Sequence, residues 1–205
     1  MIKIQYISQG ETPEQHLAHI GEACEAGCRW VQLRLKNVDM ATYLNTALAC
    51  RNICDQYGAI MIMNDHVSIA KASLADGVHL GLQDMNPKEA RKILGENAII
   101  GGTANTLEDC LHHIKDEVDY IGLGPYKYTT TKQKLSPILG LEGYQKIVLE
   151  LSKQHANTPI IAIGGIELND IEGILESGVQ GIAVSGMLTG QGGLEEIIQN
   201  IRALI

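Results

Sequence analysis

The chain has 205 residues, of which 45% are hydrophobic and 20% charged, and its formal net charge is −8. This length suits one domain over residues 1–205, and the composition supplies enough apolar side chains for a packed core. The negative charge argues against a surface that wraps nucleic acid. No apolar run approaches the roughly 20 residues that span a bilayer, and the N-terminus lacks the apolar segment of a secretory signal. We therefore expect a cytoplasmic globular protein that binds neither nucleic acid nor membrane.

Short β-rich runs alternate with longer segments of helical period from one end of the chain to the other. Predicted strands cover residues 3–8, 30–35, 60–64, 77–80, 99–102, 120–124, 160–164 and 181–185. Such alternation indicates a parallel sheet with connecting helices. Thr12-Pro13 and Asn86-Pro87 each place proline directly after an N-capping residue, so a helix is predicted to begin at each pair.

Eight evenly spaced strand–helix units without a linker predict an α/β fold closed into a (β/α)8 TIM barrel. The rival architecture, a doubly wound open sheet, normally has fewer strands and a glycine fingerprint after the first one. Residues 8–12, SQGET, contain no such fingerprint. Because TIM-barrel active sites lie at the C-terminal ends of the strands, functional residues are expected there.

The second predicted strand ends in alternating polar and apolar residues. Period-two alternation places Gln32, Arg34 and Lys36 on one face, and Leu33 and Leu35 on the other. Two cations and an amide suit a diphosphate, since arginine offers a planar donor fork and lysine a compact charge. The alternative is a solvated strand edge, which is costly for an inner barrel strand.

Two acidic residues follow the third and fourth predicted strands. Asp65 and Asp84 are expected at the same rim, where two carboxylates beside a substrate phosphate suit Mg²⁺. The alternative for each is capping of the helix that follows. His66 and His79 lie nearby, but a single histidine near a strand end is more typical of a hydrogen-bonded structural residue, so neither is assigned a catalytic role.

The longest predicted loop, residues 125–140, follows the sixth strand, and loops of this length often cover or bind a ligand. Its hydroxyls, including Thr129 and Thr131, precede Lys132, a combination that suits a phosphate. A polar surface turn would look similar.

A second phosphate site is expected after the seventh and eighth strands, where TIM barrels often build one. Gly165 would let the backbone approach the ligand, and Val184 and Ser185 end the eighth strand. The alternative is that the glycines only permit tight turns.

Taken together, these segments resemble the thiamine phosphate synthase family over nearly the whole chain. The matching segments are 31–36 (VQLRLK), 63–65 (MND), 76–84 (DGVHLGLQD), 120–125 (YIGLGP), 129–132 (TTTK), 162–166 (AIGGI) and 184–185 (VS). The resemblance implies a transferase of thiamine biosynthesis. Its reaction joins 4-amino-2-methyl-5-hydroxymethylpyrimidine diphosphate to a thiazole phosphate and releases pyrophosphate.

The resemblance also implies a role for each matched residue. The pyrimidine diphosphate would be held by Gln32, Arg34, Lys36, Asn64 and Lys132. Magnesium would be held by Asp65 and Asp84. The thiazole phosphate would be held by Thr129, Thr131, Gly165, Val184 and Ser185. In the family a C–O bond breaks to leave a pyrimidine-stabilised cation and pyrophosphate. The catalytic groups would therefore be the positively charged side chains that stabilise pyrophosphate, here Arg34, Lys36 and Lys132.

Some positions depart from the family pattern. Leu35 replaces an acidic residue, and His66 replaces a basic or acidic one. Thr103 replaces a serine and can still donate to the pyrophosphate, whereas Asn105 replaces a histidine and cannot carry a proton.

Two other functions remain as alternatives. A thiazole tautomerase would share the barrel and the thiazole phosphate pocket, but tautomerases resemble this chain less at Asp84 and in the threonine-lysine loop. A non-catalytic phospho-ligand sensor would be expected to have lost Asp65, Asp84 or Lys132. A homodimer is the expected assembly, since two-fold dimers are the commonest oligomers.

Overall fold

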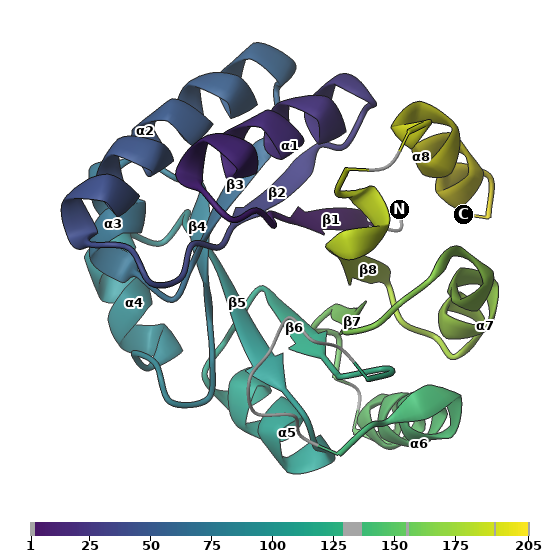
Figure 1. Cartoon of the computed structure of the whole chain (residues 1–205). Helices are drawn as coiled ribbons and strands as arrows, with labels where there is room; N and C mark the ends of the chain where they lie inside the picture. The colour runs from purple at the N-terminus through teal and green to yellow at the C-terminus, as the bar shows by residue number, and fades with distance from the viewer. Residues whose placement is uncertain (1–2, 129–136, 155, 191, 205) are drawn as a thin grey trace.

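The computed structural model describes residues 3–128, 137–154, 156–190 and 192–204. Eight parallel strands pair in chain order from β1 to β8, and β8 pairs with β1 to close the barrel. Figure 1 shows the strands in the centre and the helices in a ring around them. The predicted (β/α)8 barrel is therefore confirmed.

Every predicted strand is present. The strands are β1 (Lys3–Ile7), β2 (Trp30–Leu33), β3 (Ile60–Asn64), β4 (Gly77–Leu80), β5 (Ile99–Ala104), β6 (Tyr120–Leu123), β7 (Ile160–Ile163) and β8 (Gly181–Val184). Two strands differ most from their predicted bounds: β5 continues beyond its predicted end at residue 102, and β2 ends before its predicted limit at residue 35. Arg34 and Lys36 thus belong to the loop after the strand.

Helices connect the strands on the outside of the barrel. They are α1 (Pro13–Glu25), α2 (Met40–Tyr57), α3 (Val67–Ala72), α4 (Pro87–Leu94), α5 (Leu107–Lys115), α6 (Gly140–Lys153), α7 (Ile171–Glu176) and α8 (Leu194–Ala203), with short 3-10 turns η1 (Leu168–Asp170) and η2 (Gly186–Leu188). Thr12 and Asn86 cap α1 and α4 by accepting from Gln15 N and Lys88 N, as predicted. Among the described residues no helix is long and apolar enough to cross a membrane.

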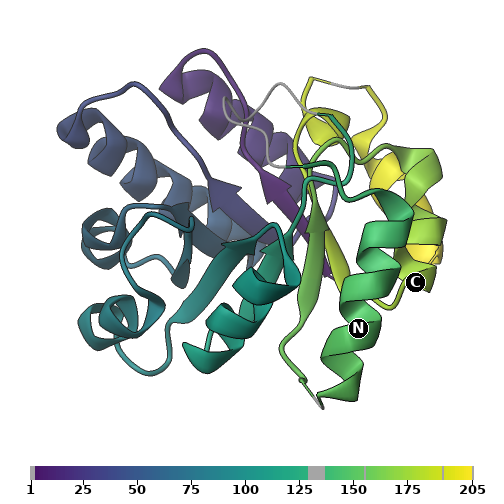
Figure 2. The same ribbon diagram turned by 90° about the horizontal axis from the view of Figure 1, so that it is seen from below.

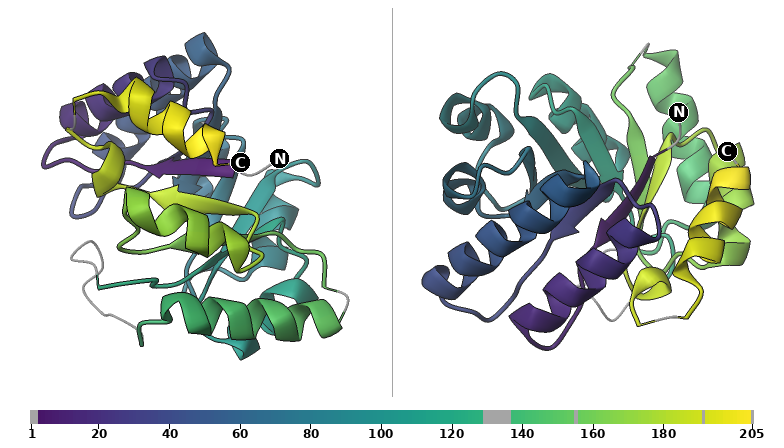
Figure 3. Two further views of the ribbon diagram at one scale, coloured as in Figure 1. Left: turned by 90° about the vertical axis from the view of Figure 1, so that its right-hand side faces the viewer. Right: turned by 90° about the horizontal axis from the view of Figure 1, so that it is seen from above.

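Seen from the side, helices flank the strands (Figure 2), and α8 lies against α1, on the side of the barrel where β8 pairs with β1 (Figure 3). A large buried cluster fills the space between strands and helices. A smaller cluster lies inside the barrel and consists of Ile7, Trp30, Ile62, Tyr120, Ile161 and Ala183. The interior is therefore filled with side chains below the rim.

Two glycines make room for large side chains in this interior. A Cβ atom on Gly101 would lie 2.2 Å from Cζ of Tyr120, and one on Gly122 would lie 2.9 Å from Cε1 of His79. Neither position has space for a side chain. The glycines of β5 and β6 thus allow Tyr120 and His79 to lie across the barrel.

Carboxylates bind the sheet together at the opposite, N-terminal end. Asp119 Oδ2 accepts from Ile100 N at 2.7 Å and from Arg91 Nη2 at 2.8 Å. Asp76 repeats the arrangement two strand–helix units earlier, where its Oδ2 accepts from Met61 N. In each case the carboxylate before an even-numbered strand joins it to the preceding strand.

Candidate active site

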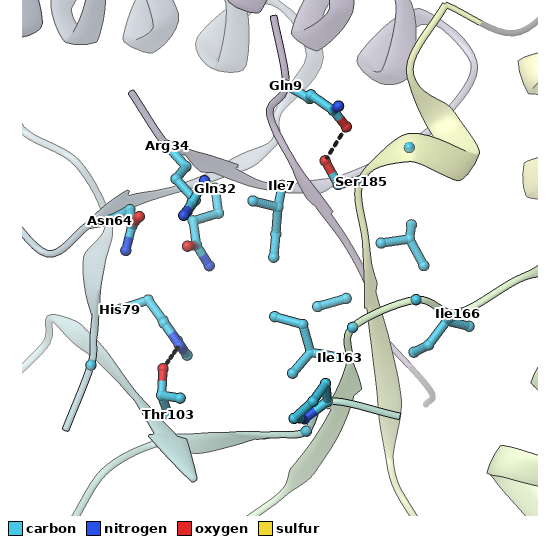
Figure 4. Close-up of a pocket in the computed structure, with 18 of the residues that line it drawn as sticks. Ile7, Gln9, Gln32, Arg34, Asn64, His79, Thr103, Ile163, Ile166 and Ser185 are labelled. Carbon is cyan, nitrogen blue, oxygen red and sulfur yellow. Dashed lines mark hydrogen bonds between the residues drawn. The ribbon is translucent and has the colours of Figure 1, made fainter. Parts of the chain in front are cut away.

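A cavity of about 570 Å³ opens at the C-terminal ends of the strands. Each strand, or the segment directly after it, contributes to its lining, through Ile7, Gln32, Asn64, His79, Thr103, Gly124, Ile163 and Val184. Figure 4 shows Gln32, Arg34 and Asn64 on one side, and Gln9 and Ser185 on another. A volume of this size is typical of small-molecule sites.

The cavity brings together most of the residues that the sequence predicts for the site. Those in its lining are Gln32, Arg34, Lys36, Asn64, Asp65, Asp84, Thr103, Gly165, Val184 and Ser185. The other three, Thr129, Thr131 and Lys132, lie outside the described residues.

Asp65 is held in place by β4, by the loop after β2 and by its own neighbour Asn64. Its backbone N donates to His79 O at 2.9 Å, and its side chain accepts from Lys36 Nζ at 2.5 Å and from Asn64 Nδ2. The backbone at Asp65 has a φ of 63°, a left-handed conformation that is uncommon outside glycine and often occurs at functional sites. The carboxylate is thus fixed beside a cation at the rim.

Asp84 reaches the same rim from the loop after β4. Its Oδ2 accepts from Gly81 N at 2.7 Å. Partial desolvation, reinforced by the Asp65 carboxylate, raises the pKa of Asp84. Neither aspartate is an N-cap, since His66 precedes α3 without a side-chain hydrogen bond and Asn86 caps α4. The capping alternative is therefore wrong for both.

These two carboxylates form a donor set suited to a hard divalent cation. Their mutual repulsion, which contributes to the raised pKa of Asp84, is what such a cation would relieve. Within the described ranges no group of three or more His, Cys, Asp or Glu forms a metal site. Two carboxylates fit Mg²⁺, which retains waters and takes further oxygens from substrate phosphates, and do not fit a closed zinc site.

Arg34 is supported by a set of contacts that the sequence analysis missed. Its backbone N donates to Ser8 Oγ at 3.0 Å, and Ser8 Oγ lies 2.7 Å from His16 Nδ1. His16 Nε2 lies 3.1 Å from Gly10 O, so the ring braces the loop after β1, and Ser8 Oγ links that loop to the one after β2. Desolvation lowers the pKa of Arg34, yet a guanidinium remains charged in proteins.

The opposite side of the cavity comes from the loops after β7 and β8. Ser185 Oγ donates to Gln9 Oε1 at 3.1 Å (Figure 4). Gly165 has a φ of +69°, and a Cβ there would lie 2.7 Å from Tyr128 O. Gly165 is therefore needed for the close approach of the segment that leads toward Thr129.

Two further polar residues line the cavity, although the sequence analysis gave them no role in the site. His79 Nε2 lies 2.9 Å from Thr103 Oγ1 (Figure 4), and Asn105 Nδ2 donates to Gly124 O at 2.5 Å. Strand pairing places His79 beside Asn64, which was itself predicted to face the site. The position of His79 near the end of β4, level with Asn64, was therefore the signal that its side chain faces the cavity.

A family model described as thiamine monophosphate synthase matches residues 5–188. The chain belongs to the thiamine monophosphate synthase family. A thiamine-phosphate synthase from Flavobacterium psychrophilum is 51% identical over 187 residues, which cover 91% of each chain. One from Flavobacterium johnsoniae is 48% identical over 199 residues, 97% of this chain and 94% of the relative.

Solved structures agree with membership of the thiamine monophosphate synthase family. Thiamine phosphate pyrophosphorylase from Pyrococcus furiosus has a TM-score of 0.83 and 30% sequence identity, covering 99% of this chain and 95% of that one. A 3-hexulose-6-phosphate synthase has a TM-score of 0.72 at 14% identity, covers all of both chains, and shares the fold alone. The predicted family and enzyme class, a transferase of thiamine biosynthesis, are confirmed, and the tautomerase and sensor alternatives are not favoured.

Proposed function

We propose that this chain joins 4-amino-2-methyl-5-hydroxymethylpyrimidine diphosphate to thiazole phosphate, giving thiamine phosphate and pyrophosphate. The observation that carries the proposal is the pairing of the acidic residues, Asp65 and Asp84, with cations at one rim of the cavity. Lys36 contacts Asp65 directly, and Arg34 lines the same cavity. A diphosphate and its divalent cation need this combination of charges.

Asp65 and Asp84 are the residues that would hold Mg²⁺. When bound, the ion supplies positive charge that neutralises the diphosphate and favours its departure. Asn64 and Lys36 keep the Asp65 side chain in place, and Gly81 N does the same for Asp84. The chain's own contribution here is a carboxylate pair that is already oriented.

The reaction breaks the C–O bond between the pyrimidine methylene and the diphosphate, and the bonding electrons leave with pyrophosphate. The thiazole nitrogen then supplies the electron pair for the new C–N bond. The charge that develops on the leaving group would be stabilised by Arg34, Lys36 and Lys132. Gln32, Asn64 and the hydroxyl of Thr103 would bind the same substrate, and no nucleophilic side chain is required.

The thiazole phosphate is assigned to the other side of the cavity. Its residues would be Gly165, Val184 and Ser185, together with Thr129 and Thr131 of the β6–α6 loop. The positive φ of Gly165 and its contact with Tyr128 support this assignment, because they bring the two loops together. A cavity of about 570 Å³ has room for two small substrates side by side.

The expectations of a homodimer, a cytoplasmic location and no nucleic-acid partner stay predictions. Small-molecule substrates follow from the family.

The testing experiment measures pyrophosphate release with both substrates, with and without Mg²⁺. We expect release to require all three components and to fall at least about 100-fold in Asp84→Asn, the loss typical of removing one electrostatic contact to a transition state. Asp55→Asn is the matched control, since Asp55 is 63% exposed and lies on α2 away from the cavity. Metal-independent release, or an equal loss in both variants, would contradict the proposal.

A further inference from the structure

A continuous hydrogen-bond network of side chains crosses the barrel beneath the cavity. Gln32 Nε2 donates to Gln5 Oε1 at 3.2 Å, and Gln5 Nε2 donates to the Tyr120 hydroxyl at 3.2 Å. The Tyr120 oxygen lies 3.0 Å from His79 Nδ1, and His79 Nε2 lies 2.9 Å from Thr103 Oγ1. Gln32, His79 and Thr103 line the cavity, whereas Gln5 and Tyr120 are buried.

The two glutamine amides at one end of this hydrogen-bond network determine which atom is the donor in each of the other hydrogen bonds. Because the Tyr120 oxygen accepts from Gln5, its own hydrogen is left to donate, and His79 Nδ1 accepts it. Burial raises the pKa of Tyr120, so the hydroxyl keeps this proton. A proton on His79 Nδ1 would instead leave the buried Tyr120 hydrogen without this acceptor, which is costly.

The consequence reaches Thr103 at the other end. With Nδ1 accepting, the neutral ring carries its proton on Nε2 and donates to Thr103 Oγ1. The Thr103 hydroxyl oxygen is then an acceptor toward His79, and its hydrogen is directed elsewhere. Thr103 lines the cavity, so that hydrogen is available to a ligand oxygen (Figure 4).

Thr103 is also fixed through its backbone. His113 lies on α5 and is buried, and its Nε2 lies 2.8 Å from Thr103 O. A Cβ on Gly102 would lie 2.6 Å from the His113 ring, so glycine is required for this contact. Two histidines from different elements thus hold one threonine, which is more support than a surface hydroxyl needs.

We propose that His79 and Tyr120 are positioning residues that direct the hydroxyl hydrogen of Thr103 into the cavity, toward an oxygen of the departing diphosphate. The inference rests on the proposed function for the identity of that oxygen. A donor already aimed at the place where negative charge develops lowers the barrier, because it need not reorient during the reaction. The hydrogen-bond network therefore acts through Thr103, and no proton is transferred along the network.

The first test reads the tautomer of His79 in the unmodified protein. Long-range ¹H–¹⁵N NMR of histidine-labelled protein separates the two ring nitrogens, and His79→Gln identifies the His79 signals among the seven histidines. We expect a neutral ring with the proton on Nε2. A proton on Nδ1, or on both nitrogens, would overturn the proposal without any assay of activity.

The second test is a double-mutant cycle on pyrophosphate release. Tyr120→Phe keeps the ring that packs edge-on against Trp30, with centroids 4.8 Å apart, and removes only the hydroxyl. We expect kcat to fall about tenfold with little change in KM, since the lost interaction strengthens in the transition state. Thr103→Ala is expected to lower kcat about 100-fold, and Thr103→Ser to restore most of it.

The cycle distinguishes positioning from a general structural role. If Tyr120 acts through Thr103, Tyr120→Phe has less than about a twofold effect in the Thr103→Ala background. An equal loss in both backgrounds would overturn the proposal. Tyr57→Phe, a half-buried tyrosine at the end of α2, is the matched control and is expected to retain full activity. If the parent releases no pyrophosphate, the proposed function fails. The NMR result still decides which nitrogen of His79 carries the proton, and so the direction of the hydrogen bonds in the network.

Discussion

Lys36 Nζ lies 2.5 Å from Asp65 Oδ2, so an ion pair joins the loop after β2 to the end of β3 at the rim of the cavity. Both partners are predicted to act on the same diphosphate, one directly and one through Mg²⁺. The Lys36 side chain is 46% exposed, so this pair contributes little to folding stability. Its importance is expected in binding and catalysis.

Replacing Lys36 by methionine should therefore affect activity far more than stability. We expect kcat/KM for the pyrimidine diphosphate to fall about 100-fold, as for loss of one charged contact to a transition state. The unfolding free energy should change by less than about 0.5 kcal/mol. Lys71→Met, at an exposed position on α3, serves as the control in steady-state kinetics and urea unfolding. Equal kinetics in the two variants would exclude Lys36 from the site.

Magnesium affinity should depend on pH because the pKa of Asp84 is raised. The metal binds the deprotonated carboxylate, and a raised pKa means that protons compete at a higher pH than for an ordinary aspartate. As the pH falls, magnesium binding should therefore begin to weaken at a higher pH than it would with an ordinary aspartate. Calorimetric titration with Mg²⁺ alone at several pH values measures this, and Asp84→Asn should remove most of the dependence. A pH-independent affinity in the parent would contradict the assignment.

Gly165→Ala should reduce both stability and binding of thiazole phosphate. The added Cβ would approach Tyr128 O to 2.7 Å at a positive φ, so we expect a loss of about 2 kcal/mol and a raised KM for thiazole phosphate. Gly58→Ala is the matched control, since Gly58 has a φ of +61° with nothing within 4 Å. It should cost about 1 kcal/mol through its φ alone and leave KM unchanged. A similar KM in both variants would remove Gly165 from the thiazole site.

Asp119 should contribute to stability alone, because it lies at the N-terminal end of the barrel. Its carboxylate accepts from both Ile100 N and Arg91, so Asp119→Ala should lower the unfolding free energy by about 2 kcal/mol. Urea unfolding measures this loss, and kcat at a permissive temperature should be unchanged. Asp55→Ala, with an exposed ion pair, should cost less than about 0.5 kcal/mol. An unchanged unfolding free energy in Asp119→Ala would contradict this, because it would show that water replaces the carboxylate without loss of stability.

The sequence predicted the barrel well because each strand is a short buried run between amphipathic helices. A buried strand ends where turn residues begin, and this change from apolar to turn-forming residues can be recognised in a single sequence. It misplaced the end of β2, since the alternation of Gln32, Arg34 and Lys36 continues beyond the last ladder hydrogen bond. The side chains still reach the cavity, because a loop can keep the direction of the strand that it extends.

His79 shows where the sequence analysis was insufficient. A histidine at a strand end carries no local sign of its partners, and two residues that hydrogen-bond with the His79 ring, Tyr120 and Thr103, are distant in the chain. Their meeting depends on the register of β4, β5 and β6 and on the space left by Gly101 and Gly122. Contacts of this kind require the closed barrel to be known first.

The measurement that tests the central claim most directly is detection of the joined product. The unmodified protein is incubated with both substrates and Mg²⁺, and the mixture is analysed by mass spectrometry, with one substrate carrying a heavy isotope in its ring. We predict thiamine phosphate that contains the label and forms in equal amount to pyrophosphate. Pyrophosphate release without labelled thiamine phosphate, or neither product while both substrates bind, would contradict the assignment of synthase activity to this chain.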